Sequence, residues 1–291
     1  MDIRRRSWIT GPGGLGAIGG MILFTLHGLA GAPASSPPVP SPAPSGTVEA
    51  EATYRVFLPL VLRSICAPIP GVTYEVFPVI NPVSFNVADN PDYNLLLLGY
   101  VPVNEYKGLV DYGGGFDPGA PQLRFLFGDH RIPVILNTYK NNGWDWERHQ
   151  RLPPPPGWPP VSVVGFAVSP GEILYLPDSG YRIGLDFQAH VLYADENQIT
   201  LKYTAEDSTA QGYTVYITNL CVEPSRFVIY ICVEPSLLAL YRQWNAWGRS
   251  RLPALRGGQP LGRARGTQID VGIRDNNVFM DPRSRKDWWQ R

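Results

Sequence analysis

Hydrophobic and polar positions alternate with a period of two along much of the chain, which is typical of half-buried β-strands. The clearest case is residues 268–274, "QIDVGIR", where three β-branched apolar residues alternate with polar or small ones. Residues 275–277, "DNN", then predict a hairpin turn, because Asn and Asp tolerate left-handed backbone. Residues 278–280 predict a short return strand. We therefore expect a β-hairpin at the edge of an all-β domain.

Strand-like runs separated by Pro- and Gly-containing turns occupy most of the remaining chain. The fold class is therefore mainly β with few short helices. We expect a smaller β-rich domain over 66–160 and a larger antiparallel β-domain over 161–291. The expected strands lie in 72–80, 84–88, 122–127, 132–140, 161–168, 172–177, 181–204 and 213–220.

Composition narrows the range of functions. The 291 residues permit one large or two small domains, and 25 basic residues balance 25 acidic ones. No broad basic face is implied, so nucleic acid is not an expected partner. The 30 prolines and 30 glycines favour extended structure and turns over helices.

The first 65 residues predict export. Residues 1–34 have an arginine-rich start, an uncharged apolar centre and a small-residue cleavage site, as a signal peptide does. An uncleaved N-terminal anchor is the alternative, and it is the one expected route to a membrane. Residues 35–65 combine a Pro/Ser linker with an apolar strand-like run. That run, "YRVFLPLVLR" at 54–63, resembles stretches near the start of exported proteins of filamentous green non-sulfur bacteria. We expect a secreted or envelope-associated, extracytoplasmic protein.

Three cysteines, Cys66, Cys221 and Cys232, are the disulfide candidates in an exported chain. A Cys221–Cys232 bond would close a small loop. A bond from Cys66 to either of the others would join the start of the chain to its body. An odd count leaves one thiol free or paired between molecules. No metal-ligand spacing accompanies the cysteines, so we expect no metal there.

Tryptophans gather in two places. Trp144 and Trp146, with Trp158 nearby, either form a platform for a sugar or peptide or cover a joint between subdomains. Trp288 and Trp289 at the other end either stack on sugars or anionic polymers or pack onto the β-domain as a terminal clamp.

The closing segment resembles that of the lysostaphin-type peptidoglycan endopeptidases, which have a duplicated-hybrid-motif β-fold. The stretch "GQPLG" at 258–262 is similar to the family's glycine turn. Ile273-Arg274-Asp275-Asn276 and Met280-Asp281-Pro282 are similar to the end of its last strands. The resemblance covers about 171–282 and implies a duplicated-hybrid-motif-like antiparallel fold.

The family's zinc ligands are missing. Gln268 and Asp270 stand where the resemblance places two histidines, and no "H-x-x-x-D" segment occurs. Zinc hydrolysis needs three protein ligands and an open position for water. We therefore expect no metal, no cofactor and no catalytic residue. The candidate residues of a metal-less binding groove are Gln268, Asp270, His190, Arg274, Trp144 and Trp146.

Three functions follow as hypotheses. The first is a non-catalytic envelope protein that binds peptidoglycan, another glycan or an envelope protein partner. The second is a zinc-dependent cell-wall endopeptidase with a non-standard site built from Asp186, His190, Asp270 and His149. The third is a structural subunit of a surface assembly. A lone histidine on an alternating strand is most often a core residue, which weighs against His190 as a ligand.

Overall fold

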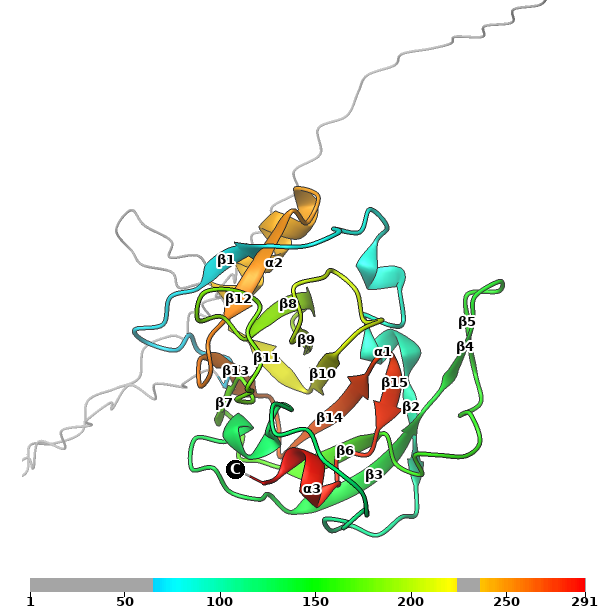
Figure 1. Ribbon diagram of the computed structural model, residues 1–291. Coiled ribbons are helices and arrows are strands. Elements are labelled where there is room, and N and C mark those ends of the chain that lie inside the picture. The colour runs from blue at the N-terminus through cyan, green and yellow to red at the C-terminus, as the bar shows by residue number, and fades with distance from the viewer. Residues whose placement is uncertain (1–64, 224–235, 291) are drawn as a thin grey trace, which may run out of the picture. The chain divides into compact units, whose positions relative to one another are not determined.

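A computed structural model describes residues 65–223 and 236–290, and the predicted signal segment and linker up to residue 64 lie outside the described residues. The described residues belong to one compact unit. They confirm the mainly β class, with antiparallel sheets and a few short helices (Figure 1). No helix among these residues has the length and apolar character needed to cross a bilayer.

Ten strands form one large antiparallel sheet. Its order is β1-β12-β8-β9-β10-β14-β6-β3-β2, and β15 is a third partner of β14 outside this order. The strands of this sheet are β1 (Glu75–Pro78), β2 (Tyr100–Val103), β3 (Ile135–Asn141), β6 (Val163–Ala167), β8 (Ala189–Ala194), β9 (Gln198–Lys202), β10 (Tyr213–Thr218), β12 (Arg251–Leu255), β14 (Gln268–Asp275) and β15 (Val278–Met280).

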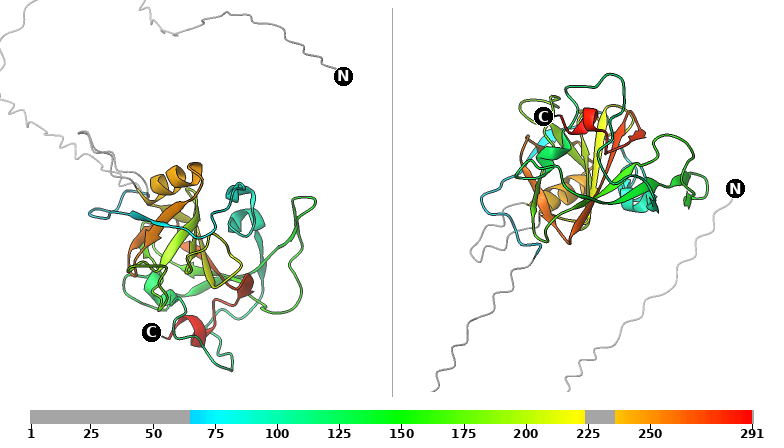
Figure 2. Two further views of the ribbon diagram at one scale, coloured as in Figure 1. Left: turned by 45° about the horizontal axis from the view of Figure 1, so that its top comes forward. Right: turned by 90° about the horizontal axis from the view of Figure 1, so that it is seen from below.

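Smaller elements flank this sheet. Three strands form a second sheet in the order β11-β13-β7, and β4 and β5 form a two-stranded ribbon that projects from the body (Figures 1 and 2). The remaining elements are β4 (Gly143–Asp145), β5 (Gln150–Leu152), β7 (Ile173–Tyr175), β11 (Leu220–Val222), β13 (Pro260–Ala264), α1 (Leu95–Leu98), α2 (Leu237–Ala246), α3 (Arg285–Trp288) and the 3₁₀ turns η1 (Val87–Asp89) and η2 (Leu123–Leu126).

The alternation seen in the sequence separates two faces of the large sheet. On β14, Ile269, Val271 and Ile273 are fully buried in the main hydrophobic core. On β10, Val215 and Ile217 lie directly opposite Ile273 and Val271 and fill the same core. Burial of these β-branched side chains on one face is what the period of two predicts.

The second face is polar but is also largely covered. The segment around α1 lies over it, and its backbone accepts hydrogen bonds from the sheet. Thr200 Oγ1 donates to the carbonyl of Tyr93 at 2.6 Å, and the hydroxyl of Tyr216 donates to the carbonyl of Asp92 at 2.6 Å. Polar side chains on β9 and β10 are therefore buried and satisfied.

The helix α2 and the C-terminal tryptophans pack onto the main core. α2 buries Leu237, Leu240 and Tyr241 and is capped by Ser236, which accepts from Ala239 N. Trp288 and Trp289 are buried, and their ring N–H groups donate to backbone carbonyls at 2.8 and 2.9 Å. The terminal clamp is thus the correct interpretation of this Trp pair.

The expected hairpin is present as β14 and β15, and β14 lies inside the large sheet between β10 and β6. Other sequence-based expectations were wrong. The boundary at residue 160 does not separate two sheets, since β3 from the first interval pairs with β6 from the second. Two expected strands are instead the 3₁₀ turns η1 and η2.

Candidate functional site

Gln268 and Asp270 lie side by side on β14, as a period of two requires. Gln268 Nε2 donates to Asp270 Oδ1 at 2.5 Å and to the hydroxyl of Tyr139 at 3.0 Å. Gly165 lies opposite Asp270 on β6, and a Cβ there would come within 2.5 Å of Gln268 Nε2. A glycine at this position therefore leaves room for the Gln268 amide.

The Asp270 carboxylate has only neutral hydrogen-bond donors. Its Oδ2 accepts from the hydroxyl of Tyr100 at 2.7 Å, from Asn219 Nδ2 at 3.0 Å and from Thr218 Oγ1 at 3.4 Å. Burial raises the pKa of Asp270, and these hydrogen bonds oppose the rise. Burial and the neighbouring Asp270 both raise the pKa of Tyr100, so its hydroxyl stays protonated and donates.

The side chains hydrogen-bonded to Asp270 form a packed polar cluster in which protein groups satisfy one another. With both oxygens of Asp270 occupied by protein donors, a metal ion would have to displace them. Within the described ranges, no three His, Cys, Asp or Glu side chains are placed to hold a metal. The arrangement offers no open coordination position for a water.

The other predicted groove residues do not join this cluster. Arg274 lies further along β14, where its Nη1 pairs with Asp92 at 2.6 Å and bonds Asn277 Oδ1 at 2.8 Å. His190 lies on β8 and is fully buried, with no hydrogen bond of standard geometry to either ring nitrogen. Burial lowers the pKa of His190 to about 4, against a weak opposite effect of Asp207 and two backbone carbonyls. It is a neutral core residue at physiological pH.

The tryptophans in and near the β4–β5 ribbon lie in different environments, one packed and two exposed. Trp144 packs with Tyr100 and Tyr139 against a small hydrophobic cluster around α1. Trp146 is 53% exposed near the turn of the ribbon, and Trp158 is 60% exposed and packs edge-on against Tyr112. These side chains do not form one continuous aromatic platform.

A disulfide joins Cys66 to Cys221, which is one of the pairings left open by the sequence. It joins the start of the described chain to β11. Cys232 lies outside the described residues.

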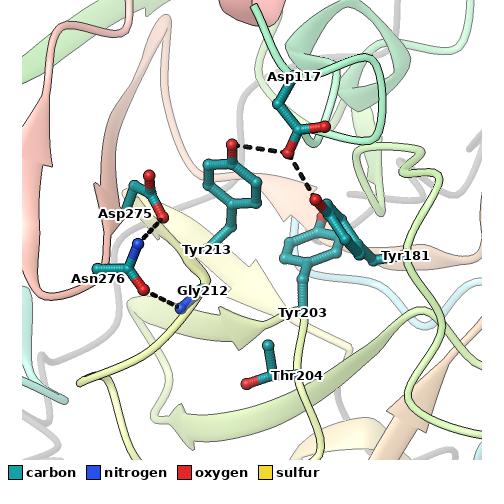
Figure 3. A pocket seen from close by; sticks show the side chains of 8 residues that line it. All are labelled: Asp117, Tyr181, Tyr203, Thr204, Gly212, Tyr213, Asp275 and Asn276. Carbon is teal, nitrogen blue, oxygen red and sulfur yellow. Dashed lines mark hydrogen bonds between the residues drawn. The ribbon is translucent and has the colours of Figure 1, made fainter.

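A cavity of about 260 Å³ lies at the opposite end of β14 from Gln268 and on the opposite face of the sheet, and we call it the tyrosine pocket (Figure 3). It forms where β9 ends, β10 begins and β14 ends, and two loops complete it. Its lining residues are Asp117, Tyr181, Tyr203, Thr204, Gly212, Tyr213, Asp275 and Asn276.

Asp117 organises one side of the tyrosine pocket. Its Oδ2 accepts from the hydroxyl of Tyr181 at 2.7 Å and from that of Tyr213 at 2.9 Å, and its Oδ1 accepts from the backbone of Gly119 at 2.7 Å. The hydrogen bond to Asp117 raises the pKa of Tyr181, and burial with the same hydrogen bond raises that of Tyr213. Both hydroxyls therefore remain protonated and hold the carboxylate in place.

The opposite side of the pocket is also polar. Asn276 Nδ2 donates to Asp275 Oδ1 at 3.0 Å, and Asn276 Oδ1 accepts from Gly212 N at 2.9 Å. Thr204 Oγ1 is buried and has no hydrogen-bond partner within the described part of the protein. Figure 3 shows Asp117 and Thr204 at opposite ends of the group, with the rings of Tyr203 and Tyr213 between them and Asn276 to one side. The pocket thus combines carboxylates, an amide, a hydroxyl and aromatic rings, as small-molecule sites do.

Sequence reasoning missed this pocket. It identified Asp117-Pro118-Gly119 only as a turn, which the Gly119 hydrogen bond confirms. Tyr181 and Tyr213 are 64 and 96 residues from Asp117 in the chain, so no local pattern joins the three. The one local signal was Gly212 before Tyr213 at the start of a strand.

Comparisons with known proteins add no identity, because no protein family, no curated protein and no solved structure matches this chain.

Proposed function

We propose that the protein is an exported, non-catalytic binding protein of the cell envelope, and that it holds one sugar unit of a glycan in the tyrosine pocket. The observation that carries this proposal is the convergence of Tyr181 and Tyr213 on the Asp117 carboxylate at the wall of the cavity. Peptidoglycan or another wall polymer is the expected partner.

The chemistry of the pocket suits a sugar. Sugar hydroxyls both donate and accept, and the pocket offers carboxylate and amide acceptors together with the unpartnered Thr204 hydroxyl. Its volume of about 260 Å³ is just below the range of roughly 300–1,000 Å³ for drug-sized ligands, which favours a single ring. Because Asp117 is already fixed by protein donors, little ordering is needed when a ligand enters.

The proposal of a non-catalytic role is supported by the hydrogen bonds of Asp270 on β14. Asp270 is committed to neutral donors from Tyr100, Asn219 and Gln268, and this arrangement supports a structural rather than a hydrolytic role. The lysostaphin-type resemblance stays a prediction about origin. Export is supported by the amino-terminal sequence and by the Cys66–Cys221 bond, since structural disulfides persist in oxidising compartments.

The test uses the secreted full chain. We expect it to sediment with isolated cell walls and to bind a monosaccharide in calorimetry. Tyr213→Phe removes one donor to Asp117, and we expect it to weaken binding by about tenfold, since such a hydrogen bond contributes roughly 1 kcal/mol. Tyr106→Phe, at an exposed tyrosine outside the pocket, is the matched control. Absence of binding to both walls and sugars would refute the proposal.

A further inference from the structure

A second cavity, of about 430 Å³, is built from two chain segments that also build the tyrosine pocket, and we call it the aromatic pocket. Four aromatic side chains are part of its lining: Phe125, Phe127, His130 and Tyr175. We propose that the aromatic pocket binds a further sugar unit of the same glycan, so that the ligand is an extended oligosaccharide. This proposal rests on the function proposed above.

The two pockets share one wall. The segment 117–130 contributes side chains to both pockets, and so does the segment 175–181. The carbonyl of Gly119 accepts from Ser179 Oγ at 2.7 Å and from Gly180 N at 2.9 Å, and these bonds fix the two segments against each other. The two pockets are therefore held in one arrangement before a ligand arrives.

The distance along this wall is short. Asp178 lines the aromatic pocket, and Tyr181, three positions later in the chain, lines the tyrosine pocket. Three extended residues span at most about 11 Å. Gln122 N donates to the carbonyl of Asp178 at 2.8 Å, which holds this end of the wall in place. Nearby units of one glycan are thus the natural occupants of the two pockets.

Aromatic surface is accessible in the second pocket. His130 is exposed and packs edge-on against the half-buried Phe125, with ring centroids 4.7 Å apart. A Cβ at Gly128 would lie 3.1 Å from the ring of Tyr175, so this glycine lets the loop approach that ring closely. Aromatic rings offer a large apolar area with a defined geometry, and the apolar face of a sugar ring fits against such an area.

The aromatic pocket also offers donors and acceptors. Asp178 Oδ1 accepts from Gln188 Nε2 at 2.7 Å, while Asp178 Oδ2 accepts no hydrogen bond from the described residues. The N–H groups of Gly257 and Gly258 likewise donate to no group within the described ranges. A Cβ at Gly257 would lie 2.5 Å from Asp178 Oδ1, so the glycine keeps the carboxylate close to these donors. Donors beside an acceptor suit hydroxyl groups, which both donate and accept, better than an ion of either sign.

Calorimetry of the full chain compares N-acetylglucosamine with a graded series of its linear oligomers. We expect the longer oligomers to bind at least ~10-fold more tightly than the single sugar, because the second unit enters its pocket from an already tethered chain. Tyr175→Ala, which removes one ring of the aromatic pocket, should abolish this gain. Tyr106→Ala, at an exposed tyrosine outside both pockets, should keep it.

His130 supplies a direct readout in the wild-type protein. Its imidazole signals in NMR spectra should shift when an oligomer is added, whereas those of His149, in the turn of the β4–β5 ribbon, should stay in place. The variant His130→Asn assigns the signals. Asn suits this position because it tolerates the left-handed backbone that His130 adopts, with a φ of 55°.

The outcomes are separable. Equal affinity for the single sugar and every oligomer, or His130 signals that stay unmoved at saturating oligomer, would overturn the inference and leave the sugar-binding function intact. A gain with oligomer length that survives Tyr175→Ala would also overturn it, because the second unit would then lie elsewhere. Binding of neither the sugar nor its oligomers, together with no binding to cell walls, would overturn both.

Discussion

Arg249 and Asp207 form a bidentate ion pair inside the protein. Arg249 Nε lies 2.7 Å from Asp207 Oδ2, and Arg249 Nη2 lies 2.7 Å from Asp207 Oδ1. Their side chains are 3% and 0% exposed. Asp207 Oδ2 also accepts from the backbone of Val83 at 3.0 Å, so the pair ties the segment before α1 to the loop after α2.

Removing one partner of this pair should be costly. We expect Asp207→Ala to lower the free energy of unfolding by about 3–5 kcal/mol, because Arg249 would keep a buried and uncompensated charge. Asp129→Ala breaks the exposed pair with Arg131 and should cost less than about 1 kcal/mol. Urea unfolding measures both, and equal effects would contradict the assignment.

His190 should make the protein sensitive to acid. Its pKa is about 4 in the folded chain and 6.5 in the reference state, so the unfolded chain takes up a proton first as pH falls. Stability contributed by the neutral ring is complete above about pH 6.5 and is lost between there and about pH 4, by roughly 3 kcal/mol. His190→Leu should flatten this part of the pH profile of unfolding.

Gly262 occupies a position that no other residue fits. A Cβ at Gly262 would collide with the backbone carbonyl oxygen of Cys221 on the neighbouring strand. Backbone on both sides cannot yield as a flexible side chain can, so we expect Gly262→Ala to lower the thermal midpoint strongly or to prevent folding. Gly266→Ala has open space around its Cβ and should be tolerated. A normal midpoint for Gly262→Ala would contradict the geometry.

The Cys66–Cys221 bond closes a loop with a sequence separation of 155. Crosslinks across long loops reduce the entropy of the unfolded chain, so we expect Cys66→Ala to cost about 2–5 kcal/mol. Adding a reductant to the wild type should cost a similar amount and should have no effect on the variant. An effect of reductant on the variant would point to a different pairing.

The Tyr100→Phe variant tests whether the hydrogen-bond network around Asp270 on β14 acts independently of the tyrosine pocket. Losing the hydroxyl removes one donor to the buried Asp270 and should cost about 1–3 kcal/mol of stability. Sugar binding should stay as in the wild type, because the two sites lie on opposite faces of the sheet. A loss of sugar binding without a loss of stability would place the ligand near Asp270 instead.

The sequence predicted the strands whose alternation is uninterrupted, and it failed where a short polar cap intervened. β14 and β15 are examples of success. In the run at 84–88, the side chain of Asn86 accepts from the backbone of Ala88 and begins the 3₁₀ turn η1. In η2, Leu123 and Leu126 are buried three residues apart, which is the repeat of a 3₁₀ turn and not of a strand.

The candidate site was less predictable for a different reason. Gln268 and Asp270 were singled out because they stand where the lysostaphin-type resemblance places two histidines, and their spacing of two puts them on one face of β14. Asp117 and Tyr181 meet Tyr213 only because the loops that carry the first two fold against the start of β10. Such a convergence depends on strand order in the sheet, which local periodicity does not encode.

The bond between Cys66 and Cys221 has a mechanical consequence. If the chain is pulled from both ends, as a tethered surface protein is, tension passes from Cys66 through sulfur directly into β11. Residues 67–220 then lie off the load path. The hydrogen bonds from Tyr181 and Tyr213 to Asp117 join residues of that interval alone, so they carry no tension. Asp275 and Asn276 lie on the loaded side, so force that peels the C-terminal strands away should open the tyrosine pocket from the side of β14.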